Sequence, residues 1–154
     1  MEAAQQEAAY ASFAATLRAG GFSEPASGWN AGQIAAHICL NNDLIRETAE
    51  RLGQGEEVGY DNSAAVGDDD LRDYAAKLGG LGELADAVGR SGARLARAHQ
   101  NLTEADRARQ IPVVIWDNGS IVADGPMPIG DLIVGNATFH LDLHHEQLRA
   151  LLAR

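Results

Sequence analysis

Apolar residues recur at alternating steps of three and four between positions 71 and 102, and this spacing limits the possible folds more than any other feature. Such steps place side chains on one side of an α-helix and favour packing against a nearly parallel helix. Gly79 and Gly80 interrupt the stretch. Each glycine inside a helix costs about 1 kcal/mol relative to alanine, so we expect a kink or break there. The apolar row comprises Leu71, Tyr74, Leu78, Leu81, Ala85, Val88, Gly92, Leu95, His99 and Leu102.

Two further helices are predicted before this one. Residues 3–18 are rich in alanine and place their aromatic and leucine side chains at helical spacing. The next helix begins after Asn30, because Asn30 and Gln33 have the spacing of a capping box, and it extends to Gly53. Residues 53–67 are rich in glycine and acidic side chains and lack apolar periodicity, which predicts a long loop.

A change of composition after position 110 predicts a short β-structure. Residues 111–117 and 120–124 are rich in β-branched side chains, and Asn118 and Gly119 between them form the pair that favours a tight hairpin turn. We therefore expect a small β-hairpin between the third helix and the fourth.

The fourth helix is expected to begin at Pro128, which suits a first helical turn, and to extend to about Ala153. A chain of 154 residues has the usual size of one domain with one core. The sequence therefore predicts an all-α fold over residues 1–154, a four-helix bundle with long connections and an inserted hairpin.

Composition argues against several classes of partner. The formal net charge of −10, with no run of basic residues, would repel nucleic acid and anionic membranes. No stretch reaches the roughly 20 apolar residues that a transmembrane helix needs. The single cysteine, Cys39, excludes an internal disulfide and is typical of a reducing compartment. We expect a cytoplasmic protein that binds a small molecule, without nucleic acid or membrane partners.

Three histidines form the candidate metal site. His140 and His144 lie one helical turn apart, so both imidazoles can bind one ion. His37 lies on the apolar side of the second helix and should face the interior. A single interior histidine usually needs only one hydrogen bond, but three together are costly unless a cation satisfies them. We predict that His37, His140 and His144 bind a metal ion.

Steps of four from these histidines reach further polar side chains. Asn41 follows His37 by one turn, and Asn136 precedes His140 by one turn. Both asparagines are candidates to orient the ligands or to bind substrate, although solvated positions near helix ends are an equal alternative. Trp116, beside the hairpin turn, is a candidate to line the entrance of a pocket or to pack on the bundle.

The remaining histidines and the cysteine have simpler interpretations. His145 is rotated by about 100° from its neighbour on the helix, so we expect it to be exposed or to support the site indirectly. His99 lies near the end of the third helix, where a contact with the helix dipole explains it. Cys39 is expected to be a small buried apolar residue.

The motif around Trp29, Ile34, His37 and Ile38, followed about a hundred residues later by the segment 140–148 with its three histidines, resembles the DinB-like metalloprotein superfamily. This superfamily includes the N-terminal domain of mycothiol-dependent maleylpyruvate isomerase. The resemblance spans most of the chain. It implies a four-helix bundle, commonly a homodimer, that binds zinc or a similar ion such as nickel or cobalt.

The resemblance also implies a set of ligands and a chemistry. One histidine of the second helix and two ligands of the fourth correspond here to His37, His140 and His144. Members of known activity use low-molecular-weight thiols such as mycothiol or bacillithiol in transfer or isomerisation reactions. This chain has histidine where the isomerase branch tends to have glutamate at the first ligand of the fourth helix. It also ends where a second domain would begin, so maleylpyruvate itself is in doubt as a substrate.

Three neutral histidines leave a divalent ion its full charge and an open coordination position, which is typical of catalytic zinc. Our leading hypothesis is a metal-dependent transferase or isomerase in which the ion generates a thiolate that attacks a small electrophile. Metal-dependent hydrolysis is an alternative, but no carboxylate base lies at helical spacing beside the ligands. A third hypothesis is a non-catalytic bundle that binds a metal or small ligand.

Overall fold

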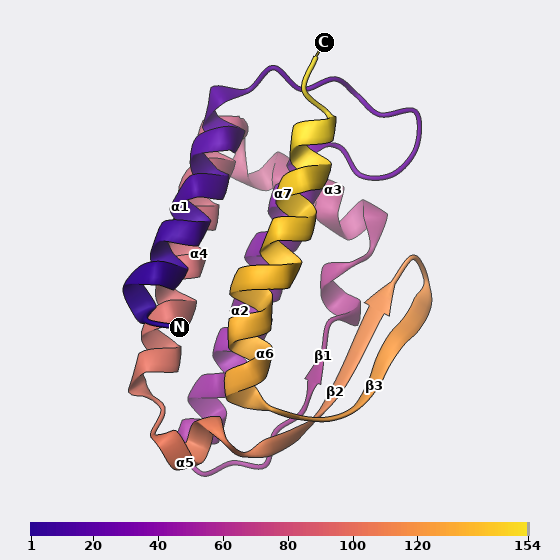
Figure 1. Cartoon of the computed structure of the whole chain (residues 1–154). Helices are drawn as coiled ribbons and strands as arrows, with labels where there is room; N and C mark the ends of the chain where they lie inside the picture. The colour runs from indigo at the N-terminus through magenta and orange to yellow at the C-terminus, as the bar shows by residue number, and fades with distance from the viewer. Residues whose placement is uncertain (154) are drawn as a thin grey trace.

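The computed structural model describes residues 1–153 and is mostly helical, with a small three-stranded sheet at one side (Figure 1). The elements in chain order are α1 (Ala3–Ala19), α2 (Ala31–Gly53), β1 (Tyr60–Asp61), the 3₁₀ turn η1 (Ser63–Ala65), α3 (Asp68–Leu78), α4 (Leu81–Asn101), α5 (Glu104–Arg107), β2 (Gln110–Asp117), β3 (Ser120–Pro128), α6 (Ile129–Gly135), the π-helical segment η2 (Asn136–His140) and α7 (Leu141–Ala150).

Local sequence signals account for the ends of the second helix. The backbone N–H of Gln33 donates to the Asn30 side chain at 2.9 Å, and the Asn30 N–H donates to Gln33 Oε1 at 3.1 Å. This reciprocal capping box confirms the predicted start of α2, and the helix ends at Gly53 as predicted. The capping box fixes where α2 begins and therefore which of its side chains face the interior.

The long periodic stretch is divided into two helices, α3 and α4, at the predicted break. Gly79 has a φ of +110°, a backbone conformation that side chains rarely allow, so the chain turns there and α4 begins at Leu81. The break lets α3 pack on α2 while α4 packs on both α1 and α2. A single uninterrupted helix could not make both sets of contacts.

The sheet differs from the expected two-stranded hairpin. β2 and β3 pair antiparallel around Asn118 and Gly119, whose positive φ values of +49° and +76° suit a tight hairpin turn. The predicted loop 53–67 also contains β1 and η1, and β1 pairs parallel with β2, Tyr60 opposite Val113. The prediction of an irregular loop was wrong here, because a two-residue strand has no periodicity to detect.

The last helical stretch, predicted as one regular helix to about Ala153, consists of three consecutive segments. α6 continues into η2, whose π-helical hydrogen bonds join residues five positions apart, and then into α7, which ends at Ala150. A π-helical turn contains more residues than an α-helical one, so it changes which side chains face inward after it. It begins at Asn136 and ends at His140, two of the predicted site residues.

The long helices α1, α2, α4 and the α6–α7 stretch lie side by side, with the sheet beside them (Figure 1). One apolar cluster lies among α1, α2, α4 and α7, and a second joins α2, α4 and α6 to the sheet. Gly92 permits the close approach of α1 and α4, since a Cβ there would lie 2.3 Å from the ring of Tyr10. Among the described helices, none combines the length and apolar character required to cross a bilayer.

Candidate metal centre

The imidazoles of His37, His140 and His144 converge between α2 and the last helical stretch. His37 Nε2 lies 2.9 Å from His140 Nε2, and His144 Nε2 lies 3.1 Å from the same atom. One nitrogen from each ring falls within 4.8 Å of the other two. The side chains of His37 and His144 are buried, with exposed fractions of 2% and 6%. The fold therefore brings His37 to the same point as two histidines that follow it by about a hundred residues.

Hydrogen bonds determine which ring nitrogen faces the cluster. The Nδ1–H of His37 donates to the backbone carbonyl of Ala65 at 2.6 Å, and the Nδ1–H of His144 donates to Gln147 Oε1 at 2.8 Å. A carbonyl oxygen only accepts, so both rings carry their proton on Nδ1 and present an Nε2 lone pair to the centre. The Nδ1 of His140 is buried without a hydrogen-bond partner among residues 1–153.

This donor set fits a divalent cation. A tetrahedral zinc ion bound at about 2.0–2.1 Å by each nitrogen separates two ligand nitrogens by about 3.3 Å. The Nε2 atoms of His37 and His144 lie close to that distance from the Nε2 of His140. Without a cation, the lone pairs of His37 and His144 both face His140, whose single proton can satisfy at most one of them well. A cation would satisfy all three nitrogens.

The electrostatic environment keeps the three rings neutral at neutral pH. Burial, followed by the repulsion that a protonated His144 would exert, lowers the pKa of His37 to about 4, although the bond to Ala65 acts in the opposite direction. Burial also lowers the pKa of His140 well below 6.5. Burial lowers the pKa of His144 too, against the effects of Gln147 and Asp117. Neutral imidazoles are the form that binds a metal ion.

Trp29 forms one wall of the centre, a role that the sequence did not reveal. Its ring centroid lies 4.9 Å from that of His37 and 6.0 Å from that of His144, and it is stacked on the latter at 23°. The indole N–H donates to Asp68 Oδ1 at 2.8 Å, which ties the ring to the first turn of α3. From the sequence, Trp29 was named only as part of a family motif.

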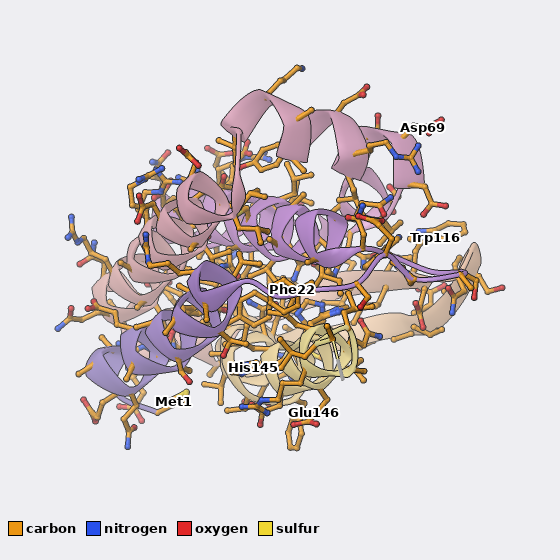
Figure 2. The ribbon with its side chains drawn as sticks, turned by 90° about the horizontal axis from the view of Figure 1, so that it is seen from above. Met1, Phe22, Asp69, Trp116, His145 and Glu146 are labelled. Atoms are coloured by element: carbon orange, nitrogen blue, oxygen red, sulfur yellow. The ribbon has the colours of Figure 1, made fainter. Side chains whose placement is uncertain are left out.

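Trp29 also lines an open cavity of about 730 Å³. Its walls come from the first turn of α3, the residues before it and the hairpin turn. The labelled side chains of Asp69 and Trp116 lie toward this side of the molecule in the view from above (Figure 2). The cavity has room for a small molecule, and Trp29 is the residue that it shares with the surroundings of the histidines. Its lining consists of Trp29, Val66, Gly67, Asp68, Asp69, Asp70, Asn118 and Gly119.

The two predicted supporting asparagines belong to a separate buried network. Asn41 Nδ2 donates to Asn136 Oδ1 at 2.6 Å, and the hydroxyl of Tyr60 donates to Asn41. Asn136 Nδ2 also bonds to the Tyr10 hydroxyl at 2.7 Å and to Asn42 Oδ1 at 2.9 Å. Within residues 1–153, the side chains of Asn41 and Asn136 form their hydrogen bonds in this network and none with the three histidines. The alternative of solvated asparagines was wrong, since both are buried.

Trp116 is half-buried, at the end of β2. Its backbone N–H donates to Asn62 Oδ1 at 2.6 Å, and its carbonyl accepts from Asn62 Nδ2 at 3.1 Å. The indole Nε1 is buried without a hydrogen-bond partner in the described part of the chain. Trp116 is not among the residues that line the cavity, so a role in binding substrate stays a prediction.

The other histidines lie outside the cluster. His145 is buried between α1 and α7, where its Nε2 lies 2.8 Å from Thr16 Oγ1 (Figure 2). Of the two alternatives predicted for His145, the exposed position was therefore wrong, because α1 covers that side of α7. Indirect support of the site stays a prediction. His99 is buried near the end of α4, with Nδ1 2.6 Å from Gln6 Nε2. Cys39 is fully buried, as predicted.

The fold resembles a solved structure described as the mycothiol-dependent maleylpyruvate isomerase, with a TM-score of 0.73 and 14% sequence identity. The similarity covers 98% of this chain and 60% of that chain, so this chain spans less than two thirds of that protein's length. At this identity the likeness shows a shared fold alone. No family model and no curated protein matches the sequence.

Proposed function

We propose that this protein is a divalent-metal-dependent enzyme that uses a low-molecular-weight thiol to transfer a group to, or isomerise, a small electrophile. The observation that carries the proposal is the convergence of three neutral imidazoles, two of them buried and the third, His140, partly buried. Two of their Nδ1 protons are held by carbonyl oxygens. The proposed ligands are His37, His140 and His144. The proposed ion is zinc, with nickel and cobalt as alternatives.

We further propose that the chain is a DinB-like four-helix bundle in which α1, α2, α4 and the α6–α7 stretch are the four helices. The shared fold with an isomerase described as mycothiol-dependent supports this assignment and the choice of a thiol as cosubstrate. A homodimer and a cytoplasmic location are part of the same proposal. At 14% identity the shared fold does not carry over that protein's substrate, so the proposal names only a class of small electrophile.

A bound divalent cation would supply positive charge that stabilises a thiolate near neutral pH. The chain's own residues would supply the rest. Three uncharged histidines leave that positive charge undiminished, unlike carboxylate ligands. Trp29 covers one side of the cluster and limits access of water to His37 and His144. The cavity that Trp29 lines would hold the electrophile.

Hydrolysis is less well supported, because it needs a base that activates water beside the ion. Glu146 is exposed and forms an ion pair with Arg149 at 2.5 Å on the outer side of α7. Asp142 is exposed as well. The candidate metal cluster of the described chain consists of histidines alone. We therefore favour thiol chemistry over hydrolysis.

Calorimetric titration of zinc-loaded, untagged protein with mycothiol, and with glutathione and cysteine as comparison thiols, tests the proposal. We expect saturable binding of at least one thiol at one equivalent per zinc. His140→Ala should abolish it, because the cluster loses its shared nitrogen. His99→Ala removes a buried histidine outside the cluster and should leave thiol binding intact. Absence of binding by every thiol to fully loaded protein would refute the thiol hypothesis.

A further inference from the structure

We propose that Asn62 and Gln147 are positioning residues that set the metal affinity of the candidate centre. They fix the orientation of two ligands, His37 and His144, through the Nδ1 side of each ring, which faces away from the proposed ion. This inference rests on the proposed function, because it concerns the same ion. Neither residue contacts the converging nitrogens. Asn62 acts on His37 through the backbone of η1, and Gln147 acts directly on His144.

The contacts that join Asn62 to His37 begin at the end of β2, where the pairing with β3 is irregular between Ile115 and Trp116. A register shift of this kind leaves backbone groups without regular ladder partners. The Asn62 side chain bonds to both backbone groups of Trp116, accepting from its N–H and donating to its carbonyl. Asn62 is 4% exposed, so these bonds are shielded from water. The amide thereby takes the place of a strand residue and joins β2 to the start of η1.

These contacts continue through η1 to His37. The backbone N–H of Ala65 donates to the Asn62 carbonyl at 2.8 Å, which closes the turn. The turn directs the carbonyl of Ala65 at His37 Nδ1, 2.6 Å away. Ala65 is fully buried, so this carbonyl has little freedom to move. The sheet thus fixes the proton and ring orientation of His37 through Asn62.

Gln147 plays the equivalent part for His144. It lies three residues after His144 on α7, and its Oε1 accepts the Nδ1–H at 2.8 Å. Groups that bond the outer nitrogen of a ligating histidine fix its tautomer and orientation, and their loss typically weakens metal binding by about 10–100-fold. Gln147 is exposed, so replacing it leaves the packed core intact.

His140 has no such support, since its Nδ1 is buried without a partner among the described residues. It also lies at the end of the π-helical segment. The centre therefore has two ligands, His37 and His144, whose Nδ1 atoms are hydrogen-bonded. The third, His140, is positioned only by its own helix. Loss of either supporting hydrogen bond should reduce metal affinity. His140 cannot compensate, because no hydrogen bond within residues 1–153 holds the Nδ1 of its own ring in place.

Zinc affinity measured by competition with a chelator tests the inference, using the whole chain and zinc alone as the probe. We expect Asn62→Ala and Gln147→Leu each to weaken binding by about 10–100-fold. Gln147→Glu should restore affinity, because a carboxylate also accepts the Nδ1–H of His144. The visible spectrum of the cobalt(II) form should change in Gln147→Leu, since the His144 ring is free to rotate.

Asn42→Ala is the matched control. Asn42 is also a buried asparagine with two side-chain bonds, to Ser91 Oγ and Asn136 Nδ2, so its loss should destabilise the fold while zinc affinity stays at the parental value. Parental zinc affinity in Gln147→Leu, a variant whose apolar core is unchanged, would overturn the role of Gln147. Parental affinity in folded Asn62→Ala, or equal losses in Asn62→Ala and Asn42→Ala, would overturn the role of Asn62. A parent that binds no zinc would overturn the proposed function itself.

Discussion

Acid should destabilise the metal-free protein through its buried histidines, and His37 permits the size of the effect to be worked out. The unfolded chain binds a proton at His37 below its ordinary pKa of 6.5, whereas the folded protein resists protonation until about 4. Between these values the unfolded state binds more protons, so stability falls as pH falls. At pH 5 this difference amounts to about 2 kcal/mol from His37 alone. His140 and His144 act in the same direction, because burial lowers their pKa values too.

The assay is urea unfolding followed by circular dichroism at pH 7 and pH 5, with a chelator present. His37→Asn is the comparison variant, because asparagine can still donate toward the Ala65 carbonyl but does not titrate. The parent should lose more stability between the two pH values than His37→Asn, by about 2 kcal/mol. Equal losses in the two proteins would refute the argument that His37 is held neutral inside the fold.

Three further perturbations follow from the geometry. Gly92→Ala should lower the free energy of unfolding by about 1–3 kcal/mol in urea, because its Cβ would overlap the Tyr10 ring. Gly89→Ala should not, because the space around Gly89 is open. Equal stability of the two variants would contradict the packing of α1 on α4. Trp29→Phe should remove a zinc-dependent change in tryptophan fluorescence, and a change that persists in this variant would place the signal elsewhere. Asn41→Ala should lower the unfolding free energy by about 1–3 kcal/mol while zinc stoichiometry stays unchanged, and loss of zinc from a folded variant would join its network to the centre.

Much of the helical framework could be predicted, because its signals are local. The capping box at Asn30 and Gln33 fixes the start of α2, and the glycine pair at 79 and 80 marks the break between α3 and α4. The spacing of His140 and His144 places both on one helical side, and the apolar neighbours of His37 predict that it faces inward. These arguments need only residues within a few turns of one another.

The rest of the site depends on contacts between distant segments. Ala65 accepts from His37 through its backbone carbonyl. Every residue has a backbone carbonyl, so the sequence does not show which one bonds to His37. β1 comprises two residues that pair with β2 about 50 positions later, so no pattern announces it. Nor does any sequence signal identify the π-helical segment that ends at His140.

The two asparagines that were predicted to support the site show the same limit of sequence-based prediction. Asn41 and Asn136 follow the helical stripe of the histidines, as predicted, but their side chains reach Tyr60 and Tyr10 instead. Helical phase determines the side of a helix that a residue occupies, whereas its hydrogen-bond partner depends on side-chain rotamers and on what the neighbouring helix presents. The amide that supports the centre comes from the unpredicted turn, at Asn62.

We propose above all that imidazoles from α2 and the last helical stretch hold one ion together. Elemental analysis of untagged protein, in the parent and in the alanine variants of His37, His140 and His144, tests it most directly. We expect one equivalent of a divalent transition metal per parent chain and loss of that metal in each folded variant. A parent without stoichiometric metal after exposure to zinc, or variants that retain the full equivalent, would contradict it.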